Sequence, residues 1–442
     1  MSFLVTKLSP PALVAPSAPT PAGELPLSST GKSRRFLPFT SFHVFHRPIA
    51  EPAETIRRAL SGALVHYYPV AGRIVAGGDH QEDARLACTG EGVAFAAAAA
   101  SCTLEDAGLL HPPPAIRLAD LALRYGGRCR PADPLLMVQV TVFACGGYVV
   151  ATAWNHGVAD AVGMAQLLRA VGELARGLPS PSVAPVRHDA RLRDVWPLFA
   201  ALRRSPDDIK PAAGGFARCE FIVPGSFIGR VKAAFRGNDA GGRPCTAFEA
   251  VAAGVWQCRA RAIGAGAAGA DAPAPHVFTA NVRELVGSGE GYYGNCISSR
   301  VVTATGGAVA HGAAVDLVKL IRDAKERMRD AFTGAGEPPL LDEELVGALR
   351  GYGALYVSTW AGIGMDGVDF GGGRPARVVP HMERTTVPSC LPCPPCSGKK
   401  GEDGGANVVA FCVTEDDVDE PGSGDQRLVW IVPRSWPPRQ GS

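Results

Sequence analysis

Residues 178–215 carry no hydrophobic periodicity, and they separate two patterned halves of this chain. From Leu178 to Gly215 the sequence is rich in Pro, Arg and Asp. Structureless connections of that length are uncommon inside one compact domain. The 442 residues are also enough for two or three domains of roughly 150 residues each. We therefore predict two domains, residues 1–177 and 216–442, with residues 178–215 as a crossover loop between them.

Both halves mix strand patterns with helix patterns. Apolar residues at helical spacing predict helices over residues 52–66, from Met164 to a stop at Gly177, and over residues 314–328. A capping box formed by Thr246 and Glu249 predicts the start of another helix. Runs of β-branched and aromatic residues predict strands over residues 39–45, 135–143, 148–154, 219–223 and 407–413.

The charge balance argues against a nucleic-acid-binding protein. The chain has 44 Lys and Arg against 42 Asp and Glu, for a net charge of +2. Its basic residues are adjacent only in pairs, such as those at positions 34–35 and 399–400. Such pairs are too short to follow a phosphate backbone.

Apolar patterning and cysteine usage predict a cytoplasmic protein without a membrane segment. The uncharged, Ala-rich stretch over residues 92–104 is shorter than the roughly 20 residues that a membrane-spanning helix needs. Prolines interrupt any signal-peptide core near the N-terminus. Twelve scattered cysteines suit reduced thiols. Cys390, Cys393 and Cys396 lack a partner pair at zinc-ligand spacing, so we expect a solvated Pro-rich loop there and no metal site.

Several matches to short motifs lack the context that their chemistry needs. Gly264–Gly269 has the letters of a dinucleotide-binding loop but follows a predicted helix, not a strand. Gly31-Lys32-Ser33 resembles the end of a phosphate-binding loop, yet Pro26 stands where its first glycine belongs. The chain has neither Gly-x-Ser-x-Gly nor His-Glu-x-x-His. The common serine hydrolases and zinc peptidases are therefore disfavoured.

One histidine has the placement of a catalytic base. Of the ten histidines, only His156 is followed four residues later by an aspartate, Asp160. The pair lies directly after the predicted strand over residues 148–154 and before a predicted helix. At such a corner a side chain can project into a cleft. On spacing alone, a hydrogen-bonded histidine beside a helix-start aspartate remains the alternative.

Four further segments extend the pattern, and together the five resemble the BAHD family of plant acyl-CoA-dependent acyltransferases. His156-x-x-x-Asp160 matches the family's HxxxD motif, and Asp369-Phe370-Gly371-Gly372-Gly373 is similar to its DFGWG motif. The other three are His66–Arg73 (HYYPVAGR), Gly291–Asn295 (GYYGN) and Ser358–Trp360 (STW).

The resemblance implies an α/β fold of two mixed-sheet domains with flanking helices, like that of chloramphenicol acetyltransferase, joined by a long crossover. It implies a channel that admits acyl-CoA as co-substrate and a small-molecule alcohol or amine as acceptor. No permanently bound cofactor is expected, and a monomer is assumed. The segments from Cys245 and from Phe3 are most similar to the branch that uses benzoyl- or hydroxycinnamoyl-CoA.

The resemblance also assigns roles to individual residues. His156 is the expected general base, because a thioester is already activated and only the acceptor's proton must be removed. Trp360 is an oxyanion-donor candidate, with a packed aromatic as the equal alternative. Asp160 is expected to pair with Arg283 and to hold the histidine loop, and Asp369, with Gly371, to anchor its own loop. Expected CoA contacts are Thr246, Phe248, Tyr293 and Thr359.

Three departures from the family pattern leave a non-catalytic BAHD-like binding protein as the alternative. Gly372 replaces the aromatic residue of DFGWG, so we expect either a void or a wider channel and predict that Gly372→Trp is modestly stabilising. Ala161 stands where the family usually has Gly. After Val413 an acidic, Pro-rich tail replaces the family's closing helix.

Overall fold

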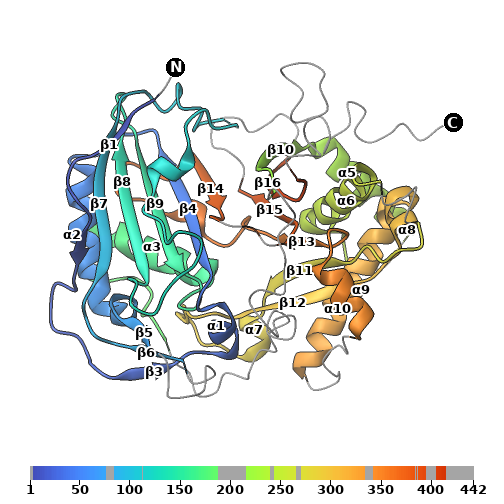
Figure 1. Cartoon of the computed structure of the whole chain (residues 1–442), viewed down its shortest axis with the longest axis horizontal. Helices are drawn as coiled ribbons and strands as arrows, with labels where there is room; N and C mark the ends of the chain where they lie inside the picture. Colours follow the sequence, from blue (N-terminus) through green and yellow to red (C-terminus); the bar gives the residue numbers. More distant parts are fainter. Residues whose placement is uncertain are drawn as a thin grey trace.

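The computed structural model describes residues 3–75, 84–111, 113–187, 216–238, 243–264, 270–333, 342–383, 385, 387–394 and 405–414. Two large mixed sheets lie side by side, the first built largely from the N-terminal half and the second from the C-terminal half (Figure 1). Most of the predicted crossover loop, the Gly-rich segment after Gly264 and the acidic tail fall outside the described residues.

The first sheet contains β4 and β9, the two strands nearest the histidine motif. Its strand order is β1-β7-β8-β9-β4-β14, and β2 also pairs with β7. Only β7 and β8 run parallel. The bounds are β1 (Val5–Lys7), β2 (Ala12–Val14), β4 (Pro38–Phe45), β7 (Val93–Ala100), β8 (Leu136–Val142), β9 (Tyr148–Asn155) and β14 (Arg377–His381). A small sheet of β3 (Glu24–Pro26), β6 (Arg85–Ala87) and β5 (Arg73–Val75) lies apart from it.

The second sheet has the order β10-β16-β15-β13-β11-β12. Strand β13 is parallel to both of its neighbours, and the remaining pairs are antiparallel. The bounds are β10 (Cys219–Val223), β11 (His276–Asn281), β12 (Ile297–Val302), β13 (Leu355–Ser358), β15 (Ser389–Cys393) and β16 (Ala406–Phe411).

Helices cover both sheets. The bounds are α1 (Ser29–Arg34), α2 (Pro52–His66), α3 (Ala161–Ala175), α5 (Gly225–Asn238), α6 (Ala247–Ala262), α7 (Arg283–Val286), α8 (Gly306–His311), α9 (Ala314–Thr333) and α10 (Glu343–Arg350). Helices α2 and α3 pack on each other against the first sheet, and α5, α6, α8 and α9 form one group on the second (Figure 1). Helix α10 packs through Leu349 on Val277 and Tyr356, on the other face of the second sheet.

Strong local signals predict the elements that position the motif. The expected helix over residues 52–66 is α2, and the two strands flanking residues 144–147 form the antiparallel pair β8 and β9. The capping box at Thr246 is present with both of its hydrogen bonds. The mixed α/β fold class is confirmed.

Strand β14 belongs to the first sheet although it lies in the second half of the chain. Residues 377–381 belong to the C-terminal half, yet they pair with β4 in the first sheet (Figure 1). A buried ion pair between Arg377 of β14 and Glu220 of β10 then links the two sheets. The second half is therefore not confined to the second sheet.

The expectation of a solvated loop at Cys390 and Cys393 is wrong. Both residues are buried in β15, a strand between β13 and β16. Pro392 has no backbone N–H to donate. Its carbonyl nevertheless accepts a hydrogen bond from the backbone N–H of Trp360 at 2.7 Å, so the strand keeps this contact. Among the described residues, no cluster of three or more His, Cys, Asp and Glu could hold a metal ion.

The Ala-rich stretch over residues 92–104 forms β7. Its alternating burial fits a strand that is covered by α2 on one face. In the part of the chain that the structure describes, no helix combines the length and hydropathy needed to cross a membrane.

Candidate active site

His156 lies between the end of β9 and the start of α3, at the expected corner. Its backbone N–H donates to the carbonyl of Leu37 at 2.8 Å, and the Asn155 side chain donates to the carbonyl of Arg35 at 2.7 Å. These bonds fasten the corner to the segment between α1 and β4. The imidazole meets Phe39 edge to face, with 6.1 Å between ring centroids. Backbone and ring contacts together hold the imidazole in one position.

Asn295, from the C-terminal half, determines which ring nitrogen of His156 carries the proton. Asn295 Nδ2 donates to the carbonyl of His156 at 2.7 Å, so its Oδ1 faces His156 Nδ1 at 3.0 Å. An amide oxygen only accepts hydrogen bonds, which places the imidazole proton on Nδ1. Nε2 then has the free lone pair. Asn295 ends the Gly291–Asn295 segment noted above, but its contact with His156 is not visible in the sequence because 139 positions separate the two residues.

Burial, and next the Arg34 guanidinium, lower the pKa of His156 from 6.5 to about 4. Asp160 and the hydrogen bond that the ring donates to Asn295 act in the opposite direction and are outweighed. The imidazole is therefore neutral at pH 7. That is the form in which a histidine can take up a proton.

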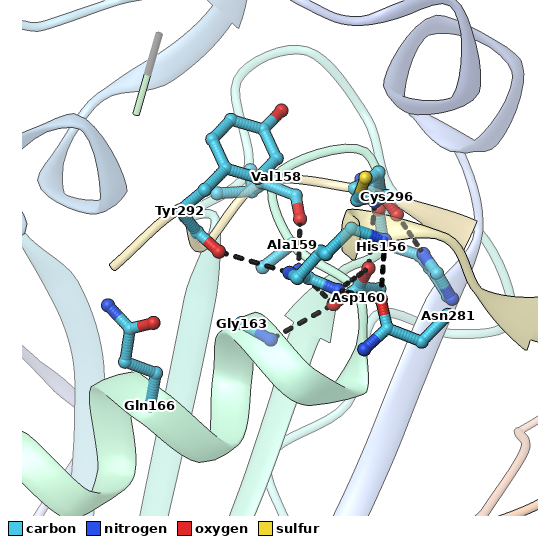
Figure 2. Close-up of polar contacts among 12 residues, drawn as sticks. His156, Val158, Ala159, Asp160, Gly163, Gln166, Asn281, Tyr292 and Cys296 are labelled. Atoms are coloured by element: carbon cyan, nitrogen blue, oxygen red, sulfur yellow. Dashed lines mark hydrogen bonds and ion pairs between the residues drawn. The ribbon is translucent and has the colours of Figure 1, made fainter. Parts of the chain in front are cut away.

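Asp160 is buried beside His156 and is held by donors from three other segments (Figure 2). It caps α3 by accepting from the backbone N–H of Gly163 at 2.9 Å, and it accepts from the N–H of Cys296 at 2.8 Å. The Arg283 guanidinium donates to both carboxylate oxygens, at 2.8 and 3.0 Å. The ion pair expected with Arg283 is thus present. These contacts join α3 to the segments that follow β11 and precede β12.

A cavity of about 480 Å³, here called the reaction cavity, opens between the two sheets and is lined by His156. Phe39 and Trp154 contribute from the first sheet, and Phe278 and Tyr356 from the second. This volume lies within the range of about 300–1,000 Å³ that is typical of small-molecule sites. Five other expected site residues line the same cavity: Asp160, Thr246, Phe248, Thr359 and Trp360.

Trp360 forms part of the wall nearest the imidazole. Its ring stacks on Phe39, with 5.2 Å between centroids, and Phe39 in turn contacts His156. Only 3% of Trp360 is exposed. One aromatic ring therefore separates the indole from the imidazole.

Tyr293 and Asp369 lie outside the lining of the reaction cavity. Tyr293 is buried against Tyr67, with 4.9 Å between ring centroids. Asp369 Oδ1 accepts from the backbone N–H groups of Gly371 and Gly373, each at 2.8 Å. The structure therefore gives both residues contacts that hold the chain together and places neither of them beside His156.

The loop at Gly372 is closely packed where a side chain would begin. A Cβ atom at this position would lie 3.0 Å from the carbonyl oxygen of Arg47 and 3.1 Å from Ile49 Cγ2. The preceding Phe370 is buried against Phe45, with 5.3 Å between centroids. The segment after β4 therefore packs against Gly372, and the expected void is not seen at the position of a Cβ.

A second cavity of about 440 Å³, here called the basic cavity, adjoins the reaction cavity. The two share Thr246, Ala280, Asn281 and Lys325. The charged residues of the basic cavity are Arg243, Glu249, Glu284, Arg322, Lys325, Glu326 and Arg329. Glu249 is buried and pairs with Arg322 and Lys325 at 3.0 and 2.9 Å. These two cations are thereby fixed beside the boundary between the cavities.

Comparison with known proteins decides the family. The model of the family described as Transferase family matches residues 5–213 and 227–416. The chain belongs to the BAHD family of acyl-CoA-dependent acyltransferases. Acyl transferase 15 of Oryza sativa subsp. japonica is 39% identical over 434 residues, which cover 95% of this BAHD chain and 97% of the relative.

A second relative agrees with this membership, and a solved structure shares the fold. Myricetin 3-O-glucosyl 1,2-rhamnoside 6'-O-caffeoyltransferase AT1 of Crocosmia x crocosmiiflora is 34% identical, over 94% of this chain and 97% of that one. The fold is similar to F. graminearum TRI101 complexed with coenzyme A and T-2 mycotoxin. That match has a TM-score of 0.66 at 16% identity and covers 90% of this chain and 96% of the other. The BAHD fold expected from the motifs is confirmed.

Proposed function

We propose that this BAHD protein transfers an aromatic acyl group, benzoyl or hydroxycinnamoyl, from acyl-CoA to a hydroxyl or amine of a plant specialised metabolite. The observation that carries the proposal is His156 itself. Its neutral imidazole lines a cavity built by both sheets, and the contact with Asn295 leaves Nε2 free to accept a proton. General-base assistance of this kind is typically worth about 10²–10⁴-fold in rate.

The proposed reaction needs no covalent enzyme intermediate. His156 Nε2 takes the proton of the acceptor as its oxygen or nitrogen attacks the thioester carbonyl. The tetrahedral intermediate collapses with cleavage of the carbon–sulfur bond, and the imidazolium returns the proton to the leaving thiolate. Trp360 is our candidate donor to the oxyanion, since its ring stacks on the same Phe39 that contacts His156.

The donor is proposed to enter through the basic cavity. Arg243 and Arg329 line this cavity, and they suit the phosphate groups of CoA. Thr246 borders both cavities and Phe248 lines the reaction cavity, where the pantetheine arm would pass. We assign Tyr293 and Asp369, with Gly371, to holding the fold, in keeping with their contacts.

The acyl group is proposed to be aromatic because the reaction cavity is lined mainly by apolar and aromatic side chains, among them Phe248 and Phe278. The Crocosmia relative is named for caffeoyl transfer. The protein is further proposed to act as a monomer in the cytoplasm, since a single chain supplies both walls of the cavity.

The test is to incubate the purified protein with acetyl-, benzoyl-, coumaroyl- and caffeoyl-CoA and with mixed alcohol and amine acceptors. Free CoA release and acylated products are measured by thiol titration and mass spectrometry. The proposal predicts acceptor-dependent CoA release with at least one aromatic acyl-CoA. CoA thioesters that bind but are never consumed with any acceptor would support the non-catalytic alternative.

A further inference from the structure

A third cavity, of about 220 Å³, runs along helix α3; we call it the α3 cavity. One face of α3 forms its long wall, with residues at the helical spacing i, i+3, i+4, i+7, i+8 and i+11: Val162, Ala165, Gln166, Arg169, Ala170 and Glu173. The opposite wall is made by residues 181–183 and by Glu290 and Gly291.

The α3 cavity and the reaction cavity are neighbours that share two lining residues. Val162 and Ile363 line both of them. The basic cavity meets the reaction cavity through a different set, which includes Thr246 and Lys325. Two further cavities therefore adjoin the reaction cavity, each at a different part of its wall. If CoA occupies the basic cavity, the α3 cavity is left for the acceptor.

The lining of the α3 cavity offers hydrogen-bond donors and acceptors rather than an aromatic slot. Gln166 is oriented by its bonds to Tyr67 Oη at 3.1 Å and to the Gly291 carbonyl at 2.8 Å. Within the described residues, the exposed Arg169 guanidinium has no hydrogen-bond or ion-pair partner. The carboxylate of Glu173 accepts from the backbone N–H and hydroxyl of Ser182, at 2.8 and 2.5 Å. Such a mixture suits neutral hydroxyl groups, which both donate and accept.

The charges of the α3 cavity are nearly balanced. Arg169 lies with two carboxylates, Glu173 and Glu290, and Glu173 is already engaged by Ser182. A polyamine would need several unengaged carboxylates, and this lining offers one beside an arginine.

We infer that the α3 cavity binds a polyhydroxylated, sugar-like part of the acceptor while the reacting hydroxyl reaches His156. The inference rests on the proposed function and specifies its acceptor as a glycoside or comparable polyol. It places the determinants of acceptor choice on α3 and residues 181–183, away from the residues that handle the acyl group.

Two variants test this assignment. Arg169→Ala removes a donor, and Val183→Trp fills the cavity from its opposite wall. Arg327→Ala, on an exposed arginine of α9 outside the three cavities, is the matched control. Rates are compared for a flavonol monoglucoside and for benzyl alcohol with the same acyl-CoA. We expect both variants to reduce the ratio of kcat/KM for the glucoside to that for benzyl alcohol by about tenfold or more. This is the size of effect that the loss of a hydrogen bond to a charged group produces. The control should leave the ratio unchanged.

Glucoside binding in the presence of CoA, measured by calorimetry, separates this inference from the proposed function. If Arg169→Ala and Val183→Trp both weaken glucoside binding, the α3 cavity is supported as the glucoside site, even if the protein never transfers an acyl group. The inference would be overturned if both variants reduced the rates for the two acceptors equally, or if they left glucoside binding unchanged. It would also be overturned if the protein bound spermidine and these variants abolished that binding.

Discussion

Asn295 contacts His156 twice, and the two contacts together leave only Nε2 free to accept a proton. We predict that Asn295→Ala lowers kcat by about 10- to 100-fold, since the ring loses its fixed tautomer. Nitrogen-15 NMR of the histidines should show a loss of the Nδ1–H form. Asn295→Asp is the matched variant, because a carboxylate still accepts from Nδ1–H and should retain more of the rate. An unchanged kcat in Asn295→Ala would contradict the role of Asn295 in setting the tautomer of His156.

At the residue scale, the sequence predicts what lies within one motif and misses what the fold assembles. His156 and Asp160 are visible because four positions separate them and both flank one strand-to-helix corner. The role of Asn295 is not visible, because its contact depends on how β12 approaches that corner. The tight packing at Gly372 was missed for the same reason, since Arg47 and Ile49 come from the other half of the chain.

At the scale of elements, Asp160 is the N-terminal cap of α3 and the link between that helix and Arg283. We predict that Asp160→Asn lowers both the melting temperature and the rate. Asparagine still caps the helix, but it leaves the Arg283 charge buried and unpaired, at a cost of about 3–5 kcal/mol. Asp342→Asn is the control, because Asp342 caps the exposed start of α10 through Leu345 without an ion pair. Lost activity with an unchanged melting temperature would instead make Asp160 a chemical participant.

The Gly372 loop gives a second prediction at this scale. We now expect Gly372→Trp to destabilise the protein by about 1–3 kcal/mol, because a side chain must displace Arg47 and Ile49. Gly229→Trp on α5 is the control, since a Cβ there meets no atom within 4 Å. Thermal unfolding measures both. A more stable Gly372→Trp would show that this loop can adopt a course with room for an indole.

Element prediction succeeded where one local pattern sufficed and failed where neighbouring strands decided the outcome. The amphipathic spacing of α2 and the capping box of α6 are local. Strand β15 contains Pro392, which local rules exclude from a sheet interior, and only its neighbours β13 and β16 make it a strand. Strand β14 was missed because its partner β4 lies more than 300 positions away in the sequence.

For the whole molecule, the buried His43 and His276 and the half-buried His381 link stability to pH. Burial lowers the pKa of His43 and His381 to about 4 and that of His276 to about 3. The unfolded chain takes up these protons near pH 6.5, whereas the folded protein does so only near pH 3–4. Stability is therefore complete above pH 6.5 and decreases as the pH falls below it. Each such group contributes a loss of up to about 1.4 kcal/mol per pH unit.

Urea unfolding at pH 7.5, 6.0 and 5.0 measures this effect. His276→Phe should make the decline shallower, because the His276 ring stacks on Trp256 and neither of its nitrogens has a hydrogen-bond partner within the described residues. The exposed His311 provides the control, His311→Gln, which should leave the slope unchanged. A stability that is flat between pH 7.5 and 5.0 would contradict the linkage.

The central claim is that His156 removes the acceptor's proton, and the rate of His156→Ala tests it most directly. Transfer is followed at pH 7 with an acyl-CoA and acceptor that the wild-type protein uses, while CoA binding and melting temperature confirm an intact protein. We expect His156→Ala to lower kcat by at least about 10²-fold with little change in CoA affinity. Turnover within tenfold of the wild-type rate would contradict it.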